Sequence, residues 1–189
     1  MNGEVSAGAD RGGSAAIRAA GEADLPVLRE IEVAAGAPFA AIGMTEIAED
    51  DPPTLERLRE FAEAGRAWVW IERDEPVAYL VLGVVDGAAH IEQVSVRPDF
   101  AGRRIGLALI RHAARWALAR GIDTMTLTTF TEVPWNGPYY RRAGFREIAP
   151  ADLGPRLRAI RAAEVAHGLD RTSPRTAMRA ACAEVLTTH

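Results

Sequence analysis

The sequence predicts a mixed α/β domain, a sheet of antiparallel and parallel strands with helices on its faces. Three apolar strand patterns follow one another within residues 67–96, and the turn signal Asp86-Gly87 joins the last two as a hairpin. From residue 90 onward, strand and helix patterns alternate, as in a sheet with helices packed on it. With 189 residues, the chain is long enough for one domain with its own core.

The N-terminal part is expected to hold one weak strand and two helices. These are a strand over residues 17–20, a helix from Asp24 to about Ala35, and a helix from Thr54 to Ala64. Asp24 and Thr54 carry side-chain oxygens that can accept a hydrogen bond at a helix N-terminus. Residues 37–53 are expected to form a long irregular connection, and long ordered loops are often functional.

The remaining elements follow from periodicity. The apolar residues Ile105, Leu109 and Trp116 recur at helical spacing, and Gly121 ends that helix. Strands are expected over 67–71, 77–85, 90–96, 124–130 and 145–148, helices over 104–120, 136–142 and 155–167, and a last strand or strand plus tail over 176–186.

Composition and charge exclude several classes of function. The net charge is −4, so a broad nucleic-acid-binding surface is not expected. All 22 lysine-plus-arginine residues are arginines, and the absence of lysine excludes Schiff-base chemistry and a Walker-type phosphate loop. The four histidines lie far apart and show no metal-ligand spacing, so no metal is expected.

The chain is expected to be one cytoplasmic domain with a short tail. A single cysteine, Cys182, cannot form an internal disulfide and indicates a reducing compartment. No apolar run is long enough to span a bilayer, so no membrane association is expected. Residues 1–16 are small, polar and rich in glycine, which predicts a disordered tail, and residues 17–189 are expected to form the domain.

The segment from Val94 to Ile110 indicates an anion site. It reads as a short apolar strand, a basic turn with two glycines, and the start of an amphipathic helix. Such a turn exposes backbone N–H groups at a helix N-terminus, and the helix dipole favours a guest such as a diphosphate. Arg103 and Arg104 could pair with phosphate oxygens. The alternatives are an ordinary turn and two solvated arginines.

Two motifs resemble those of the GNAT-type N-acetyltransferases. The family shows V-x-P-x-x-R-G-x-G-I-G-x-x-L-L before its central helix, and this chain matches it at Val96, Pro98, Gly102, Ile105, Gly106 and Leu109. Ala101 and Arg104 stand where the family has an arginine and a glycine. Residues 136–145 resemble the family's N…Y-x-x-x-G-F signature. The resemblance covers residues 17–148 and implies the GNAT fold, a central, mostly antiparallel twisted sheet with helices on both faces.

The resemblance implies acetyl-CoA as the cosubstrate. In such enzymes the strand before the loop offers main-chain groups to the pantetheine arm, and the matching residues are Val94, Ser95 and Val96. The loop N–H groups would hold the diphosphate, and they belong to Gly102, Arg103, Arg104, Ile105, Gly106 and Leu107. Asn136 could hydrogen-bond the pantetheine, although capping of the following helix is the more expected role.

Acetyl transfer to an amine needs a base and an acid. The amine must lose a proton, because an alkylammonium has a pKa of about 10.4, and the departing thiolate must gain one. Tyr140 matches the family tyrosine that protonates the thiolate, and its alternative is a packing role; Tyr139 is the weaker candidate. Glu92 is the expected base, and its alternative is a structural glutamate at the sheet edge. Simple strand alternation places Glu92 on one face with Val94 and Val96.

His90 could assist Glu92 through water or could be only a strand-end residue. With these residues, the resemblance implies an N-acetyltransferase that moves the acetyl group of acetyl-CoA to a primary amine by direct attack. A small-molecule amine is the first expectation for the acceptor, and the resemblance also allows a homodimer. The alternatives are a protein or peptide acceptor and an acyl-CoA-binding sensor or interaction module without catalysis.

Overall fold

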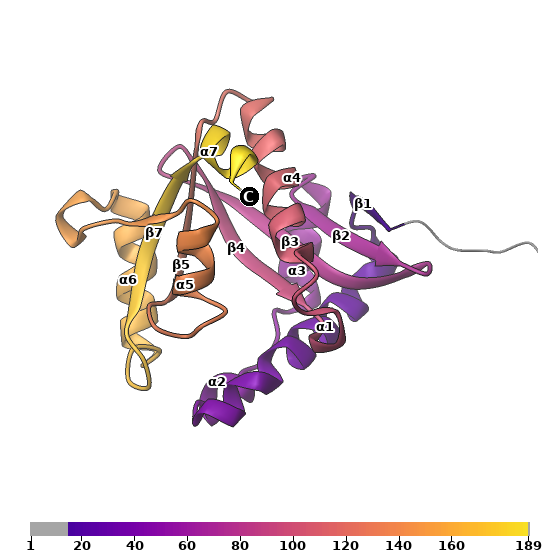
Figure 1. Ribbon diagram of the computed structural model, residues 1–189, viewed down its shortest axis with the longest axis horizontal. Coiled ribbons are helices and arrows are strands. Elements are labelled where there is room, and N and C mark those ends of the chain that lie inside the picture. The colour runs from indigo at the N-terminus through magenta and orange to yellow at the C-terminus, as the bar shows by residue number, and fades with distance from the viewer. Residues whose placement is uncertain (1–14, 189) are drawn as a thin grey trace, which may run out of the picture.

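The computed structural model describes residues 15–188, which form a seven-stranded sheet with helices on both faces (Figure 1). The strand order is β1-β2-β3-β4-β5-β7-β6, and of its neighbouring pairs β4 and β5 are parallel while the others are antiparallel. The predicted mixed α/β class with a mostly antiparallel sheet is therefore confirmed. Of the predicted tail, residues 1–14 lie outside the described residues, and Ala16 already belongs to β1.

The elements have the following bounds. The strands are β1 Ala16–Ala19, β2 Ala67–Glu72, β3 Glu75–Val85, β4 Ala88–Val96, β5 Thr124–Phe130, β6 Arg146–Glu147 and β7 Arg175–Ala181. The α-helices are α1 Leu25–Gly36, α2 Thr45–Ala48, α3 Leu55–Glu63, α4 Ile105–Leu118, α5 Gly137–Arg142, α6 Pro155–Ala166 and α7 Cys182–Thr187. Short 3-10 helices are η1 Glu22–Asp24, η2 Ala37–Ile42, η3 Pro98–Phe100 and η4 Pro150–Asp152.

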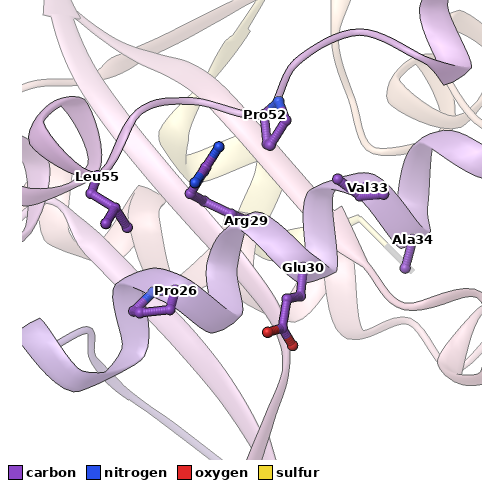
Figure 2. Close-up of a pocket in the computed structure, with 7 residues that line it drawn as sticks. All are labelled: Pro26, Arg29, Glu30, Val33, Ala34, Pro52 and Leu55. Carbon is purple, nitrogen blue, oxygen red and sulfur yellow. The ribbon is translucent and has the colours of Figure 1, made fainter.

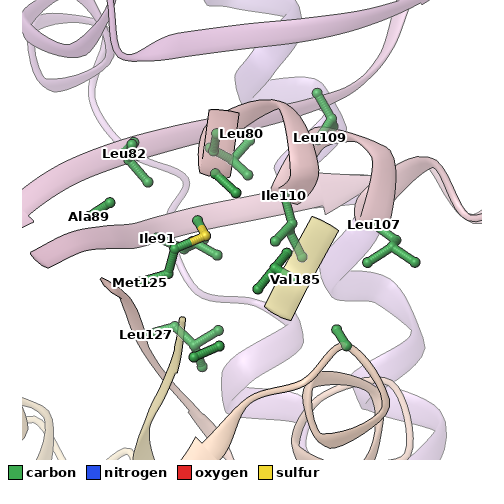
Figure 3. Close-up of a cluster of buried hydrophobic side chains, with 14 of the residues drawn as sticks. Leu80, Leu82, Ala89, Ile91, Leu107, Leu109, Ile110, Met125, Leu127 and Val185 are labelled. Carbon is green, nitrogen blue, oxygen red and sulfur yellow. The ribbon is translucent and has the colours of Figure 1, made fainter. Parts of the chain in front are cut away.

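The central strands are apolar on both faces because each face is covered by helices. In β3, Leu80 and Leu82 point to α4, whereas Tyr79 and Val81 point to α1 and α3. Figure 3 shows the larger cluster, in which side chains of α4 and α7 pack on β3, β4 and β5. Each fully buried Leu or Ile there stabilises the fold by roughly 1.5–3 kcal/mol.

Residues 37–53 are more regular than predicted. They form η2 and α2, and Phe39, Met44 and Ile47 pack against Phe130 and Val133 at the end of β5. The prediction of an irregular loop is therefore wrong for residues 37–48, because these apolar side chains find a buried partner that lies far away in the sequence.

The two predicted helix caps differ in outcome. Thr54 Oγ1 accepts the N–H of Arg57 at 3.2 Å, so this cap is confirmed. Asp24 does not cap α1 with its side chain. Its carboxylate instead binds Arg18 at 2.6 Å and the N–H of Gly21 at 2.7 Å, because a nearby guanidinium is a stronger partner than a backbone N–H.

The C-terminal part completes the sheet and core. β7 inserts between β5 and β6, and the predicted last strand ends at Ala181, after which α7 begins. Cys182 and Val185 of α7 join the core under α4. The start of α6 is capped by a residue from another part of the chain. The Asp86 carboxylate, in the β3–β4 turn, accepts the N–H groups of Arg156 and Leu157, at 3.1 and 2.9 Å. None of the helices in residues 15–188 has the length and apolar character needed to cross a bilayer.

Candidate active site

β4 and β5 pair over three residues and then separate. The parallel ladder joins residues 89–91 to residues 125–127, after which β4 follows β3 and β5 follows β7. In Figure 1 the two strands lie together at one end and diverge toward the other. We call residues 92–96 and 128–130 the splayed edges. Within residues 15–188, no strand pairs with their facing main-chain groups.

A β-bulge at Glu92 marks the point of separation. Ile91 lies opposite Leu82 and Gln93 lies opposite Val81, so Glu92 is an extra residue in β4. The extra residue shifts the side-chain alternation by one. Both Glu92 and Gln93 therefore turn to the face that α1 and α3 cover.

Glu92 does not share a face with Val94 and Val96, so that prediction is wrong. The two valines pack toward the α4 core. The Glu92 carboxylate lies instead over Gly83, and its Oε1 is 4.0 Å from Arg57 Nη2. The prediction fails because the period of two assumes an unbroken ladder.

The surroundings of Glu92 favour proton uptake. Its side chain is 30% exposed, and burial raises the pKa of the carboxyl above its usual range. The positive charges of Arg57, Arg66 and Arg156 oppose the rise without cancelling it. A carboxylate with a raised pKa is better matched to general-base work near neutral pH than an exposed one.

The main-chain groups of Val94 and Val96 in β4 face toward β5, across the gap between the splayed edges. The N–H of Arg97 donates to the carbonyl of Val77 in β3, at 3.0 Å. Main-chain groups alternate in direction along a strand, so those of Val94 and Val96 point toward β5. The main chain of Ser95 points toward β3, so its N–H and C=O groups are not available on the side of this edge that faces β5.

The loop between β4 and α4 ends in a left-handed residue. Gly102 has φ +75° and Arg104 has φ +60°. The carbonyl of Arg104 accepts the first bond of α4, from the N–H of Ala108 at 3.0 Å. The preceding N–H groups have no acceptor within the helix, and they belong to Ile105, Gly106 and Leu107. This is the geometry of a main-chain anion site at the positive end of a helix.

The two loop arginines differ in their surroundings. Arg103 Nη2 lies 2.6 Å from Glu72 Oε1, and its guanidinium lies 5.3 Å from the ring centre of Phe100. Arg103 is therefore tied to β2. Arg104 is exposed and forms no ion pair with residues 15–188.

Both tyrosines of α5 are placed by a close approach to β5. A side chain on Gly137 would overlap the carbonyl of Thr131, so only glycine lets α5 start here. Tyr140 then enters the core. The Tyr139 hydroxyl reaches the first turn of α4, where it would lie 2.9 Å from a Cβ on Gly106.

Burial keeps both phenols protonated. It raises the pKa of Tyr139 to about 12 and raises that of Tyr140 further. The charges of Glu32 and Arg175 also act on the pKa of Tyr140, in opposite directions. Tyr140 is therefore a neutral hydroxyl at neutral pH, in the cluster against which Val94 and Val96 of β4 also pack.

Asn136 binds β5 and leaves one oxygen free. Its Nδ2 donates to Thr129 Oγ1 at 3.1 Å, and it forms no side-chain cap on α5. The expected capping role is therefore wrong. The buried Oδ1 accepts no hydrogen bond from the described residues, which is costly unless a ligand supplies a donor.

His90 is a buried residue and not a strand-end one. Its side chain is bonded through Nδ1 to Thr126 Oγ1 at 2.9 Å, and the residue is 2% exposed. Burial lowers its pKa to about 4, although the charge of Glu164 acts in the other direction. His90 is therefore neutral at neutral pH, and it lies opposite Gly83, on the face that carries Glu92.

Sequence reasoning missed a carboxylate beside the splayed edge of β4. Glu32 of α1 accepts hydrogen bonds from Tyr79, Gln93 and Ser95. The available signal was a glutamate within the apolar stripe of α1, next to Ile31.

A surface cavity of about 560 Å³ lies elsewhere, between α1 and the start of α3 (Figure 2). Figure 2 shows Arg29, Glu30 and Val33 of α1 along it, with Pro52 and Leu55 on the other side. None of the residues predicted for catalysis or cosubstrate binding lines this cavity.

Comparison with known families gives one match over more than half of the chain. The model of the Acetyltransferase (GNAT) family matches residues 31–145. This range includes the bulge, the loop before α4 and both tyrosines.

Solved structures share the fold at low sequence identity. PaiA N-acetyltransferase from Thermoplasma acidophilum, in complex with coenzyme A, has a TM-score of 0.66 and 16% identity, over 89% of this chain and 99% of that one. Ribosomal-protein-S18-alanine N-acetyltransferase from Escherichia coli has a TM-score of 0.62 and 16% sequence identity, over 89% of this chain and 94% of that one. N-acetylglutamate synthase from Neisseria gonorrhoeae was solved in complex with coenzyme A and N-acetyl-glutamate. It has a TM-score of 0.64 and 17% sequence identity, over 89% of this chain and 35% of that one. At these identities the likeness concerns the fold alone.

Proposed function

Because the chain belongs to the GNAT acetyltransferase family, we propose that it transfers the acetyl group of acetyl-CoA to a primary amine of a small molecule. The observation that carries the proposal is the divergence of β4 and β5. It leaves two unpaired main-chain edges, and one of them carries the half-buried carboxylate of Glu92. The buried phenol of Tyr140 belongs to the cluster against which Val94 and Val96 of the same edge pack.

The residues at this place fit the parts of acetyl-CoA. The pantetheine arm is a chain of amides, and its N–H and C=O groups can pair with the main chain of Val94 and Val96 as an added strand would. A pantetheine N–H is also a suitable donor for the buried Oδ1 of Asn136. The N–H groups from Gly102 to Leu107 would hold the diphosphate, and those of Ile105, Gly106 and Leu107 support this because they have no acceptor within α4.

Bound acetyl-CoA supplies an activated acetyl thioester, and the chain supplies the proton transfers. Glu92 accepts a proton from the acceptor amine, directly or through one water. A main-chain N–H near Val94 donates to the carbonyl oxygen as it gains negative charge. Tyr140 donates its proton to the sulfur as the carbon–sulfur bond breaks.

Direct attack by the amine is favoured over a covalent acyl-enzyme. The one cysteine, Cys182, is buried and its Sγ donates to the carbonyl of Ile122 at 3.5 Å. Burial raises the pKa of its thiol to about 11, so the thiolate needed as a nucleophile is scarce at neutral pH.

The surroundings of β5 support a small acceptor. The ring of Phe39 from η2 lies 5.8 Å from that of Phe130 and 5.4 Å from that of Trp135, measured between centres. The segment 37–48 thus packs on the end of β5, and we infer that it narrows the space open to an acceptor there. A wide peptide groove would need this segment to lie elsewhere.

Two measurements test the proposal. Calorimetry should detect saturable binding of coenzyme A, and a thiol-release assay with acetyl-CoA should detect turnover with alkylamines or amino acids. We expect kcat/KM for the best small amine to exceed that for peptides. Absence of coenzyme A binding by folded protein would refute the proposal, and binding without turnover on any amine would favour a binding module.

A further inference from the structure

A carboxylate on α1 is held at the splayed edge of β4 by three neutral donors. Glu32 Oε2 accepts the hydroxyl of Tyr79 at 2.7 Å and that of Ser95 at 2.6 Å, and Oε1 accepts Gln93 Nε2 at 2.7 Å. Gln93 and Ser95 both belong to the splayed edge. These bonds fix the position of one negative charge beside the place where acyl transfer is proposed.

This half-buried charge has no counter-charge. Among residues 15–188, no arginine or histidine nitrogen lies within ion-pair distance of Glu32. Glu164 of α6 is also largely shielded from water, but it differs from Glu32 because it forms ion pairs with Arg161 and Arg175. A carboxylate removed from water costs free energy unless a cation compensates it.

A purely structural link between α1 and the sheet would not need a charge. A glutamine at position 32 could accept from Tyr79 and Ser95 through its one oxygen, and its NH2 group could donate to the amide oxygen of Gln93 if that amide turned over, without the cost of a buried anion. The charge of Glu32 is also felt at Tyr140, whose pKa it raises, although Tyr140 packs in the core under α4. The bonds to Gln93 and Ser95 place the Glu32 carboxylate beside the splayed edge of β4.

We propose that Glu32 binds the ammonium group of the acceptor, which makes the acceptor an aliphatic amine that is cationic at neutral pH. This inference rests on the proposed acetyltransferase function and narrows its substrate class. The ammonium donates a hydrogen bond to the remaining lone pair of Glu32 Oε1, since Oε2 already accepts two donors and Oε1 one.

The charge changes during transfer fit this role. One ammonium proton passes to Glu92, the nitrogen lone pair forms the bond to the acetyl carbon, and the carbon–sulfur bond breaks. The sulfur takes the proton of Tyr140, and the nitrogen then gives its second proton to the Tyr140 phenolate, which leaves an amide nitrogen with one hydrogen. The amide product is neutral, so it loses its ion pair with Glu32 and binds more weakly than the acceptor did.

The test compares two acceptors of equal shape and different charge. An alkylamine that is active in the thiol-release assay is paired with the O-alkylhydroxylamine of the same length, which is uncharged at neutral pH. In Glu32→Gln, we expect KM for the alkylamine to rise about tenfold or more, and KM for the hydroxylamine to rise less than about threefold. An equal change for both acceptors, or no change for either, would overturn the assignment.

Glu30→Gln is the matched control. Glu30 is on the same helix and is exposed at the cavity of Figure 2, so this variant removes an equal charge away from the splayed edges. KM for the alkylamine should change less than about twofold in this variant, because an exposed charge is screened by water and salt.

Two further measurements keep the assignment separate from folding and from the proposed function. In the unmodified protein, an N,N-dimethylalkylamine should inhibit at least about tenfold more strongly than the alcohol of the same carbon skeleton, and equal inhibition would also overturn the assignment. Coenzyme A affinity of Glu32→Gln should equal that of the unmodified protein. If the unmodified protein neither binds coenzyme A nor acetylates any amine, the proposed function itself fails.

Discussion

The Glu92 carboxylate occupies the space that a side chain on Gly83 would need, so the two residues are matched across β3 and β4. Gly83→Ala places a methyl group against Glu92 Oε1 and must displace it. We expect kcat of acetyl transfer to fall by about tenfold or more, because a base out of line by an ångström loses much of its effect. Steady-state thiol release measures this change.

Gly21→Ala adds the same methyl group where the nearest atom, Asp24 Oδ2, is 3.8 Å away. This control should retain full activity. If Gly83→Ala also retains it while staying folded, then the position of Glu92 is not important for catalysis.

Replacement of Glu92, the proposed base, should remove the fall of kcat at low pH. Burial raises the pKa of Glu92, so the unmodified protein should lose kcat as the pH falls through a value above that of an exposed glutamate. In Glu92→Gln, kcat should fall by about 10²-fold or more and its further fall at low pH should disappear. A pH series of thiol release checks both, and a retained fall at low pH would assign the titration to another group.

The same substitution should not destabilise the fold. A carboxyl whose pKa is raised by folding holds its proton more tightly in the folded state, so its contribution lowers stability as the pH rises between the unfolded and folded pKa values. Glu92→Gln removes this penalty. The free energy of unfolding at neutral pH, from urea titration, should be equal to or greater than that of the unmodified protein.

Removal of the Tyr140 hydroxyl should slow transfer without weakening cosubstrate binding. Tyr140→Phe keeps the packing against Phe145, whose ring centre is 5.8 Å away. We expect kcat to fall by about 10²-fold, with the affinity for coenzyme A unchanged in calorimetry. In Tyr139→Phe, kcat should change less than about threefold, because that hydroxyl lies at the start of α4. An unchanged rate in Tyr140→Phe would leave this residue a packing role.

Sequence patterns predicted the sheet and most helices because those depend on local periodicity. The hairpin at Asp86-Gly87 and the helix ending before Gly121 are both read from a few neighbouring residues. By contrast, η2 and α2 form because Phe39 and Met44 meet Phe130, about ninety positions later. Such long-range packing leaves no local pattern.

The candidate site was predictable in outline but not in its contacts. The family resemblance suggested Glu92 and Tyr140 as site residues, while the bulge that turns Glu92 to the α1 face depends on pairing between β3 and β4. The ion pair of Arg103 with Glu72 and the bonds of Glu32 likewise join distant segments. Strand alternation alone cannot supply them.

The cap on α6 should contribute measurably to stability. The Asp86 carboxylate accepts two N–H groups at the start of that helix, so Asp86→Ala leaves both without an acceptor. The cost should be about 1–2 kcal/mol, as for other lost helix caps. Asp86→Asn keeps one oxygen and tolerates the positive φ of this turn, so its cost should be about half as large. Urea unfolding of the three proteins measures the series, and equal stability of all three would contradict the capping role.

Two substitutions of Arg104 separate its side chain from its backbone. Arg104→Gly and Arg104→Ala both remove the guanidinium, but only glycine relieves the left-handed conformation at φ +60°. The glycine variant should therefore be the more stable of the two, by about 1 kcal/mol in urea unfolding. If main-chain N–H groups hold the diphosphate, both variants should bind coenzyme A within about threefold of the unmodified protein. A loss of about tenfold or more in both would instead assign the contact to the guanidinium, since the two variants share only its absence.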